Sequence, residues 1–173
     1  MNQKFEKAAK SAVNKITEEI LYQIDTWSGP WPSYKKMTKT VYYPNSMTRK
    51  RFFDTMDQMT RSGWVKKIIA DEKVSYTITA KGRLRQLALK IIKQKKVKQD
   101  SIITLVIFDI PELRRQYRDF LRRLLKQAGF KLLQKSVFLA ECKLSKEFYV
   151  LIEESGMSKY VLVLEGKIQF MQK

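Results

Sequence analysis

The N-terminal segment of the chain carries a regular helical pattern of hydrophobic residues. Its apolar positions recur at steps of three and four, at Phe5, Ala9, Ala12, Ile16, Ile20 and Ile24. This spacing places them along one side of a helix, so it predicts an amphipathic helix over residues 3–26. Gly29, Pro30 and Pro32 follow, and these residues do not continue a helix.

A second helical pattern lies between residues 45 and 63. Asn45 and Ser46 precede it as candidate caps, and Gly63 follows it as the predicted stop. Its apolar face consists of Phe52, Met56 and Met59. The pattern therefore predicts a helix of about four turns.

A β-hairpin is predicted directly after this helix. Two short β-rich runs, residues 64–69 and 74–79, are separated by the turn 70–73. A further amphipathic helix begins after the stretch Thr79-Ala80-Lys81-Gly82. Helix, helix, hairpin and helix is the element order of a winged helix-turn-helix, which we predict for this half of the chain.

The C-terminal half opens with an apolar strand and a helix. Residues 102–108 form a nearly continuous apolar run that suits a central strand buried on both faces, and Pro111 ends it. Residues 112–128 then show a core stripe of Leu113, Tyr117, Phe120, Leu121, Leu124 and Leu125. The other side of this predicted helix carries Arg114, Arg115, Arg118, Arg122 and Arg123. These arginines either face solvent and phosphate or pair with carboxylates at a subunit contact.

The remaining C-terminal elements complete a recognisable order. Strands are predicted at 130–133, 136–140 and 160–165, and a second helix at 145–155. The order β-α-β-β-α-β is that of the ferredoxin-like fold. The predicted fold class is therefore α+β, with a winged helix-turn-helix followed by a ferredoxin-like domain.

The distribution of charge separates the two halves. The chain has 173 residues and a formal charge of +18. Residues 1–99 hold 22 basic and 8 acidic side chains, whereas residues 100–173 hold 13 and 9. A field of this sign attracts polyanions, above all nucleic acid. We therefore predict a DNA-binding domain with a basic linker helix at 1–99 and a second domain at 100–173.

Composition also excludes several kinds of site. The chain has no histidine and one cysteine, Cys142, which is expected to pack at a strand end. Zinc sites built on Cys and His, Ser-His-Asp triads and intrachain disulfides are therefore excluded. Neither a signal peptide nor an 18-residue apolar run is present, so we expect a cytoplasmic protein with no membrane partner.

The predicted winged helix places its basic residues where such domains meet DNA. The helix after residue 45 begins with candidate groove contacts at Ser46, Thr48, Arg49, Lys50 and Arg51. The hairpin carries candidate phosphate contacts at Lys66, Lys67 and Lys73. The stretches MDQMTRSGWV and YTITAKG also resemble the second helix and wing of winged-helix transcription regulators.

The C-terminal half resembles a known domain. The stretches FDIPELRR and GFKLLQKSVF are similar to the signature of the Cas2-like domain, which occurs in the small CRISPR spacer-acquisition subunit and in PaaX-type repressors. The resemblance spans roughly residues 102–166. It implies a PaaX-like repressor in which this domain is a dimerisation platform. The further C-terminal region of such repressors is not expected here, so an acyl-CoA effector site is not carried over.

Asp109 matches the position of the proposed metal ligand in the CRISPR subunit. Under that reading, the aspartates of two protomers bind Mg²⁺ and assist phosphodiester hydrolysis. The other reading is structural, in which Asp109 accepts backbone hydrogen bonds before Pro111 or helps to start the next helix. A single carboxylate without an acidic constellation favours the structural reading, and no cofactor is predicted with it.

The sequence thus favours a sequence-specific regulator of transcription. We expect a homodimer whose two winged helices bind an inverted repeat in double-stranded DNA and repress a promoter. The alternatives are a metal-dependent endonuclease or CRISPR spacer-acquisition subunit that uses Asp109, and a nucleoid protein that binds DNA without sequence preference. The operator, the effector and the regulated genes are not readable from the sequence.

Overall fold

The computed structural model describes Thr17, residues 19–22, Ile24, and residues 48–70, 73–94 and 102–167. Contacts between residues divide the chain into two units, Met1–Gln86 and Leu87–Lys173. The division falls inside a helix, whereas the predicted boundary between residues 99 and 100 lies outside the described residues. That boundary stays a prediction. In the described part of the chain, no helix is long and apolar enough to cross a membrane.

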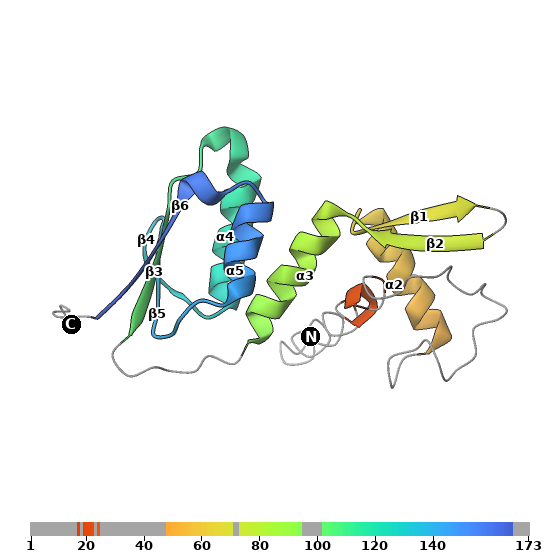
Figure 1. The fold of residues 1–173 in the computed structure, drawn as a ribbon, viewed down its shortest axis with the longest axis horizontal. Helices are drawn as coiled ribbons and strands as arrows, with labels where there is room; N and C mark the ends of the chain where they lie inside the picture. The colour runs from red at the N-terminus through yellow and green to blue at the C-terminus, as the bar shows by residue number, and fades with distance from the viewer. Residues whose placement is uncertain are drawn as a thin grey trace, which may run out of the picture. The chain divides into compact units, whose positions relative to one another are not determined.

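The N-terminal unit contains a helix and an antiparallel hairpin (Figure 1). Helix α2 (Arg49–Arg61) leads into β1 (Val65–Ala70) and β2 (Lys73–Ile78), and α3 (Ala80–Lys93) follows. The two strands pair in register from Val65 opposite Ile78 to Ala70 opposite Lys73. The predicted helix, hairpin and following helix are therefore confirmed to within a few residues.

The core of this unit joins the first predicted helix to α2 and the hairpin. Its buried residues are Ile20, Leu21, Ile24, Phe52, Met56, Met59 and Val65. The described residues 17, 19–22 and 24 are helical, and most of the helix predicted for residues 3–26 lies outside the described residues. The predicted apolar face of α2 is confirmed, because all three of its members are buried in this cluster.

The start of α2 differs from the prediction. Its N-cap is Thr48, whose hydroxyl oxygen accepts a hydrogen bond from the backbone N–H of Arg51 at 3.4 Å. The predicted caps, Asn45 and Ser46, lie outside the described residues. Threonine serves here because an extended residue with a short side-chain oxygen reaches the free N–H groups of the first turn. Gly63 ends the helix at φ 69° as predicted.

A tight junction fixes the hairpin to α3. The hydroxyl of Thr79 donates to the carbonyl oxygen of Gly63 at 2.6 Å and accepts from the backbone N–H of Gly82 at 3.0 Å. The backbone N–H of Thr79 donates to the carbonyl oxygen of Trp64 at 3.0 Å. A Cβ atom on Gly82 would lie 2.0 Å from the same carbonyl oxygen. Only glycine therefore allows this approach between α3 and the residue that precedes β1.

The C-terminal unit is a four-stranded antiparallel sheet with helices on one side. The strands are β3 (Ile103–Phe108), β4 (Lys131–Gln134), β5 (Val137–Ala140) and β6 (Val161–Gly166), arranged in the order β4-β5-β3-β6. Figure 1 shows α4 (Arg115–Gln127) and α5 (Lys146–Glu154) on the same side of this sheet. This is the ferredoxin-like arrangement, in which each helix connects two strands that are separated by a third. The fold class is α+β.

The core of the C-terminal unit lies between the sheet and its helices. Alternate residues of β3, namely Thr104, Val106 and Phe108, are buried, and the ring of Phe108 stacks on that of Phe138 with 6.0 Å between centroids. The hydroxyl of Thr104 is fully buried and donates to the carbonyl oxygen of Cys142 at 2.7 Å. Cys142 is itself buried just after β5, as predicted.

The start of the predicted helix 112–128 is not part of α4. Residues Glu112–Arg114 form a 3₁₀ turn, and α4 begins at Arg115. Leu113, which the sequence placed in the core, is 100% exposed. The cause is local, because the tighter turn after Pro111 rotates Leu113 out of the periodic face that α4 presents to the sheet. A second 3₁₀ turn, Ser158–Tyr160, precedes β6.

The face of the sheet opposite the helices is apolar. Cross-strand pairs place Leu105 beside Leu164 and Ile107 beside Leu162, and the other neighbour of Ile107 is Val137. Partners in a ladder point to the same face, so these five side chains form one surface, which we call the open sheet face. Leu162 is 52% exposed and Leu164 is 46% exposed.

Candidate nucleic-acid interface

Helix α2 presents a polar row on the side opposite its buried face. Arg51, Asp54, Gln58 and Arg61 are exposed and follow one another at steps of three and four residues. Because this spacing keeps side chains on one side of a helix, the four lie along one line. We call them the α2 polar row. Its side chains include an arginine that suits guanine, a glutamine that suits adenine and a carboxylate that accepts from cytosine.

The five predicted groove contacts have different positions and roles in the structure. Ser46 lies outside the described residues, Arg49 is the first residue of α2, and Thr48 is the exposed N-cap whose hydroxyl binds the backbone of the first turn. Lys50 and Arg51 are exposed. Of the five predicted residues, Lys50 and Arg51 are therefore the described side chains that project from the helix without serving as its cap.

The hairpin lysines do not share one face. Lys66 pairs with Thr77 and Lys67 with Tyr76, and adjacent residues of a strand point to opposite sides. Both lysines are exposed. Lys73 is the first residue of β2 and pairs with Ala70 at the far end of the hairpin. Lys66 and Lys67 therefore do not line one surface, and each is available to backbone phosphate from its own face of the hairpin.

Several residues of this region were missed by the sequence reasoning. Asp54 and Gln58 were not identified, although their spacing from Arg51 was a readable signal. Ile68 and Ile69 are 41% and 68% exposed on the hairpin, where a β-rich pattern predicted only strand structure. Exposed isoleucines beside lysines are apolar groups available to a DNA groove.

Aromatic contacts hold the hairpin against its neighbours. The guanidinium carbon of Arg85 in α3 lies 5.1 Å from the centre of the Trp64 ring, a cation–π contact, and burial lowers the pKa of this arginine. Burial, followed by the negative charge of Asp57, raises the pKa of Tyr76. The charge of Asp57 in α2 is therefore felt at Tyr76 in β2.

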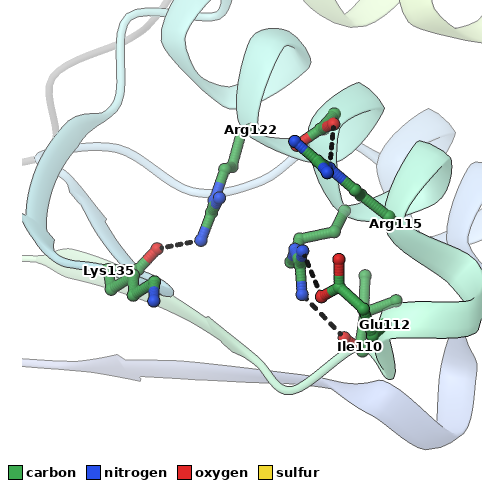
Figure 2. A network of polar contacts seen from close by, with 7 residues as sticks. Ile110, Glu112, Arg115, Arg122 and Lys135 are labelled. Atoms are coloured by element: carbon green, nitrogen blue, oxygen red, sulfur yellow. Dashed lines mark hydrogen bonds and ion pairs between the residues drawn. The ribbon is translucent and has the colours of Figure 1, made fainter.

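A second group of cations lies on α4 and the turn after β4. Arg118 donates to a Glu112 carboxylate oxygen at 2.7 Å and to the carbonyl oxygen of Ile110 at 3.5 Å, as Figure 2 shows. Arg122 donates to the carbonyl oxygen of Lys135 at 2.7 Å. Of the five predicted arginines, Arg115 and Arg123 are exposed, whereas Arg114, Arg118 and Arg122 are half-buried.

The arginine at the start of α4 has a different environment. Arg114 donates to the carbonyl oxygen of Gly156 at 3.5 Å, and its guanidinium carbon lies 5.6 Å from the centre of the Tyr160 ring. The ammonium group of Lys159 lies 5.0 Å from the same ring. Arg114 therefore ties the turn before α4 to the turn before β6, and Tyr160 is the residue that the sequence reasoning missed there.

Asp109 is an exposed residue at the end of β3. Its backbone N–H donates to the carbonyl oxygen of Tyr160 at 3.0 Å, so the backbone at this position continues the contact between β3 and β6. Among the described residues, no three side chains of the types that bind metals are grouped closely enough to hold an ion. The described surroundings of Asp109 within one protomer therefore do not fit a magnesium site, which needs several oxygen ligands.

A comparison with known families identifies the type of domain in the C-terminal unit. Residues 96–173 match the family model of the PaaX protein central Cas2-like domain. The match covers every strand of the sheet together with α4 and α5, so the chain contains a Cas2-like domain. It supports a PaaX-like protein and is consistent with a regulator of transcription. No curated protein sequence matches the chain significantly.

Proposed function

We propose that the chain is a transcription regulator that binds double-stranded DNA through a winged helix formed by its N-terminal unit. The observation that carries this proposal is the construction of α2. Its apolar face is buried against the first helix and the hairpin, and its opposite side carries the α2 polar row. A helix held in this way by its own domain offers a fixed polar edge to the major groove.

The hairpin supplies the second part of the proposed interface. It follows α2 directly, and the Thr79–Gly82 junction holds its end against α3. Lys66 and Lys67 are exposed on its opposite faces. In the proposed complex, the α2 polar row reads bases, whereas the hairpin lysines contact phosphate and carry no sequence information.

We further propose that the protein acts as a homodimer joined through the open sheet face. Leu162 and Leu164 are about half exposed on β6, next to apolar residues of β3 and β5. An apolar sheet face of this kind is a suitable subunit interface. Two copies related by a twofold axis would then address the two halves of an inverted repeat, and occupation of a promoter would repress it.

The test of DNA recognition begins with selection of bound duplexes from a random library, followed by affinity measurements on the selected site. Arg51→Ala and Gln58→Ala should change which base pairs are preferred, with about 1–3 kcal/mol of discrimination lost for each good contact. Lys66→Gln and Lys67→Gln should weaken binding to all sequences and each reduce the salt slope by about one. The matched control is Lys90→Ala, which removes an exposed cation from α3.

Two outcomes would contradict this function. One is a selection that enriches no sequence, which would instead support a nucleoid-type protein. The other is the same effect from both sets of variants, which would mean that base reading and phosphate contact are not separated between α2 and the hairpin. A duplex cleaved in Mg²⁺ by the wild type and not by Asp109→Ala would favour the endonuclease alternative.

A further inference from the structure

One side of α4 carries a row of cations that the proposed winged helix does not use. Arg115, Arg118 and Arg122 follow one another at steps of three and four along one side of α4, next to the buried Leu121 and Leu125. Lys135 lies in the turn between β4 and β5, and its carbonyl oxygen accepts a hydrogen bond from Arg122 (Figure 2). We call Arg115, Arg118, Arg122 and Lys135 the α4 cation row.

Contacts on the protein orient the middle of this row before any ligand arrives. Arg118 is held by Glu112 and by the carbonyl oxygen of Ile110, and Arg122 by the carbonyl oxygen of Lys135. Arg115 lies 3.7 Å from Asp119, a long contact between exposed groups. Side chains that are already ordered lose less conformational entropy on binding, so the row is preorganised for an anionic partner.

The row keeps a positive excess despite these contacts. Its four cations face two carboxylates, Glu112 and Asp119. The bond of Arg122 is to a carbonyl oxygen, which is uncharged and leaves the arginine charge uncompensated. The pKa of Glu112 is lowered by its hydrogen bond and charge contact with Arg118 and then by the charges of Arg115 and Lys135. The carboxylate therefore lies in the combined field of three cations of this row.

The geometry of the row suits a nucleic-acid backbone. The seven residue-to-residue steps from Arg115 to Arg122 rise about 10 Å along a helix. One DNA strand carries a phosphate about every 3.4 Å along the duplex axis, so the row spans roughly three phosphate steps. Arginine forks bind phosphate oxygens in pairs, which lysines do not. The half of the chain that carries the row has a net charge of +4, so a second copy of it is a weaker partner for these cations than a duplex, whose backbone is uniformly negative.

We propose that the α4 cation row is a second phosphate-binding surface, one that contacts the backbone of a nucleic-acid duplex independently of the winged helix. The proposal deepens the proposed function, since the ligand is the same duplex, but it assigns a nucleic-acid contact to the Cas2-like domain itself. The base sequence of the duplex is not read here, because contacts to phosphate alone carry no sequence information.

The experiment measures binding of the full chain to a random-sequence 30-base-pair duplex at several salt concentrations. The variant Arg115→Gln/Lys135→Gln removes two exposed cations and leaves the Glu112–Arg118 and Arg122–Lys135 backbone contacts in place. The control Lys143→Gln/Lys146→Gln removes two exposed cations from the same unit, away from the row. Urea unfolding of each variant, followed in parallel, reports that the fold is intact.

The expected result for the row variant is a salt slope smaller by about 1.8, with binding at 0.1 M salt weakened by some tens of times, and a slope close to wild type for the control. A wild-type slope in the row variant would overturn the proposal. Equal losses in both variants would also overturn it, because they would reflect total charge. So would an unchanged slope with a shifted monomer–dimer equilibrium, which would make the row a subunit contact.

This experiment can succeed or fail independently of the proposed base recognition by α2. If the row variant loses slope while Arg51→Ala and Gln58→Ala leave base preference unchanged, the second surface stands and the proposed α2 reading fails. If base preference changes and the row variant behaves as wild type, the α2 reading stands and the second surface fails.

Discussion

Gly82→Ala tests whether the junction between the hairpin and α3 is as tight as its contacts indicate. A new Cβ would lie 2.0 Å from the carbonyl oxygen of Trp64 and 2.9 Å from its carbonyl carbon. These are backbone atoms, so no side-chain rotation relieves the overlap. Inserting a carbon into a packed site costs about 1–3 kcal/mol, and separating α3 from Trp64 also loses the capping bond of Thr79, worth about 1 kcal/mol. We expect a destabilisation of about 2–4 kcal/mol.

Helix propensity alone predicts the opposite result, a more stable Gly82→Ala protein, so the measurement distinguishes the two arguments. Gly82 lies inside α3, and alanine is favoured over glycine in a helix by about 1 kcal/mol. The assay is urea unfolding followed by tryptophan fluorescence, because all three tryptophans precede residue 65 and report the N-terminal half. Gly166→Ala is the control, since its Cβ would meet nothing within 4 Å. A Gly82→Ala protein as stable as wild type would refute the close approach.

Three further predictions concern the C-terminal unit. Thr104→Val should destabilise by about 1–3 kcal/mol in urea unfolding, because the Cys142 carbonyl oxygen loses a buried donor, and Thr104→Ser should cost less because it keeps the hydroxyl. Arg118 lowers the pKa of Glu112 below its ordinary 4.5, so the pair should stabilise the fold at neutral pH. This stabilisation should be lost as the pH falls through the lowered pKa of the folded state. In Arg118→Gln, NMR titration should show the pKa of Glu112 returning toward 4.5. Leu162→Glu/Leu164→Glu should convert the proposed dimer to monomers, as a mass measurement would show, whereas Leu113→Glu, at a fully exposed leucine, should leave it a dimer. Dimers in the wild type and in both variants would contradict the sheet-face interface.

The order of elements was largely predictable from the sequence because hydrophobic periodicity is a direct consequence of burial. The hairpin and the β-α-β-β-α-β order were both found in this way, because Phe52 and Met56 repeat at a helical interval and residues 102–108 form an apolar run. That run was expected to be buried on both faces, whereas only alternate residues of β3 are buried. Leu113 was misplaced because periodicity alone does not distinguish the first turn of an α-helix from a 3₁₀ turn after proline. The cap was also misplaced, since Asn45, Ser46 and Thr48 all have the chemistry of a cap and only the backbone selects one.

The candidate site was less predictable than the fold. Lysines and arginines were located by charge, but charge says nothing about direction, and Lys66 and Lys67 proved to point to opposite faces of the hairpin. Contacts between distant segments were out of reach of sequence reasoning. The bond from Arg122 to the Lys135 backbone joins residues that are 13 positions apart, and it depends on how β4 and β5 turn.

The uneven charge of the chain bears on where a dimer interface can form. Residues 100–173 contribute only four of the eighteen net positive charges, so joining two copies through this half brings together the surfaces that repel least. Added salt should then tighten the proposed dimer slightly by screening the remaining repulsion, while it weakens duplex binding steeply by reducing counterion release. Sedimentation should show the tighter dimer and DNA titration the weaker duplex binding as salt is raised from about 0.05 to about 0.5 M, where the screening length falls several-fold. A dimer that dissociates as salt rises would mean that ion pairs, and not the apolar sheet face around Leu162 and Leu164, hold the two copies together.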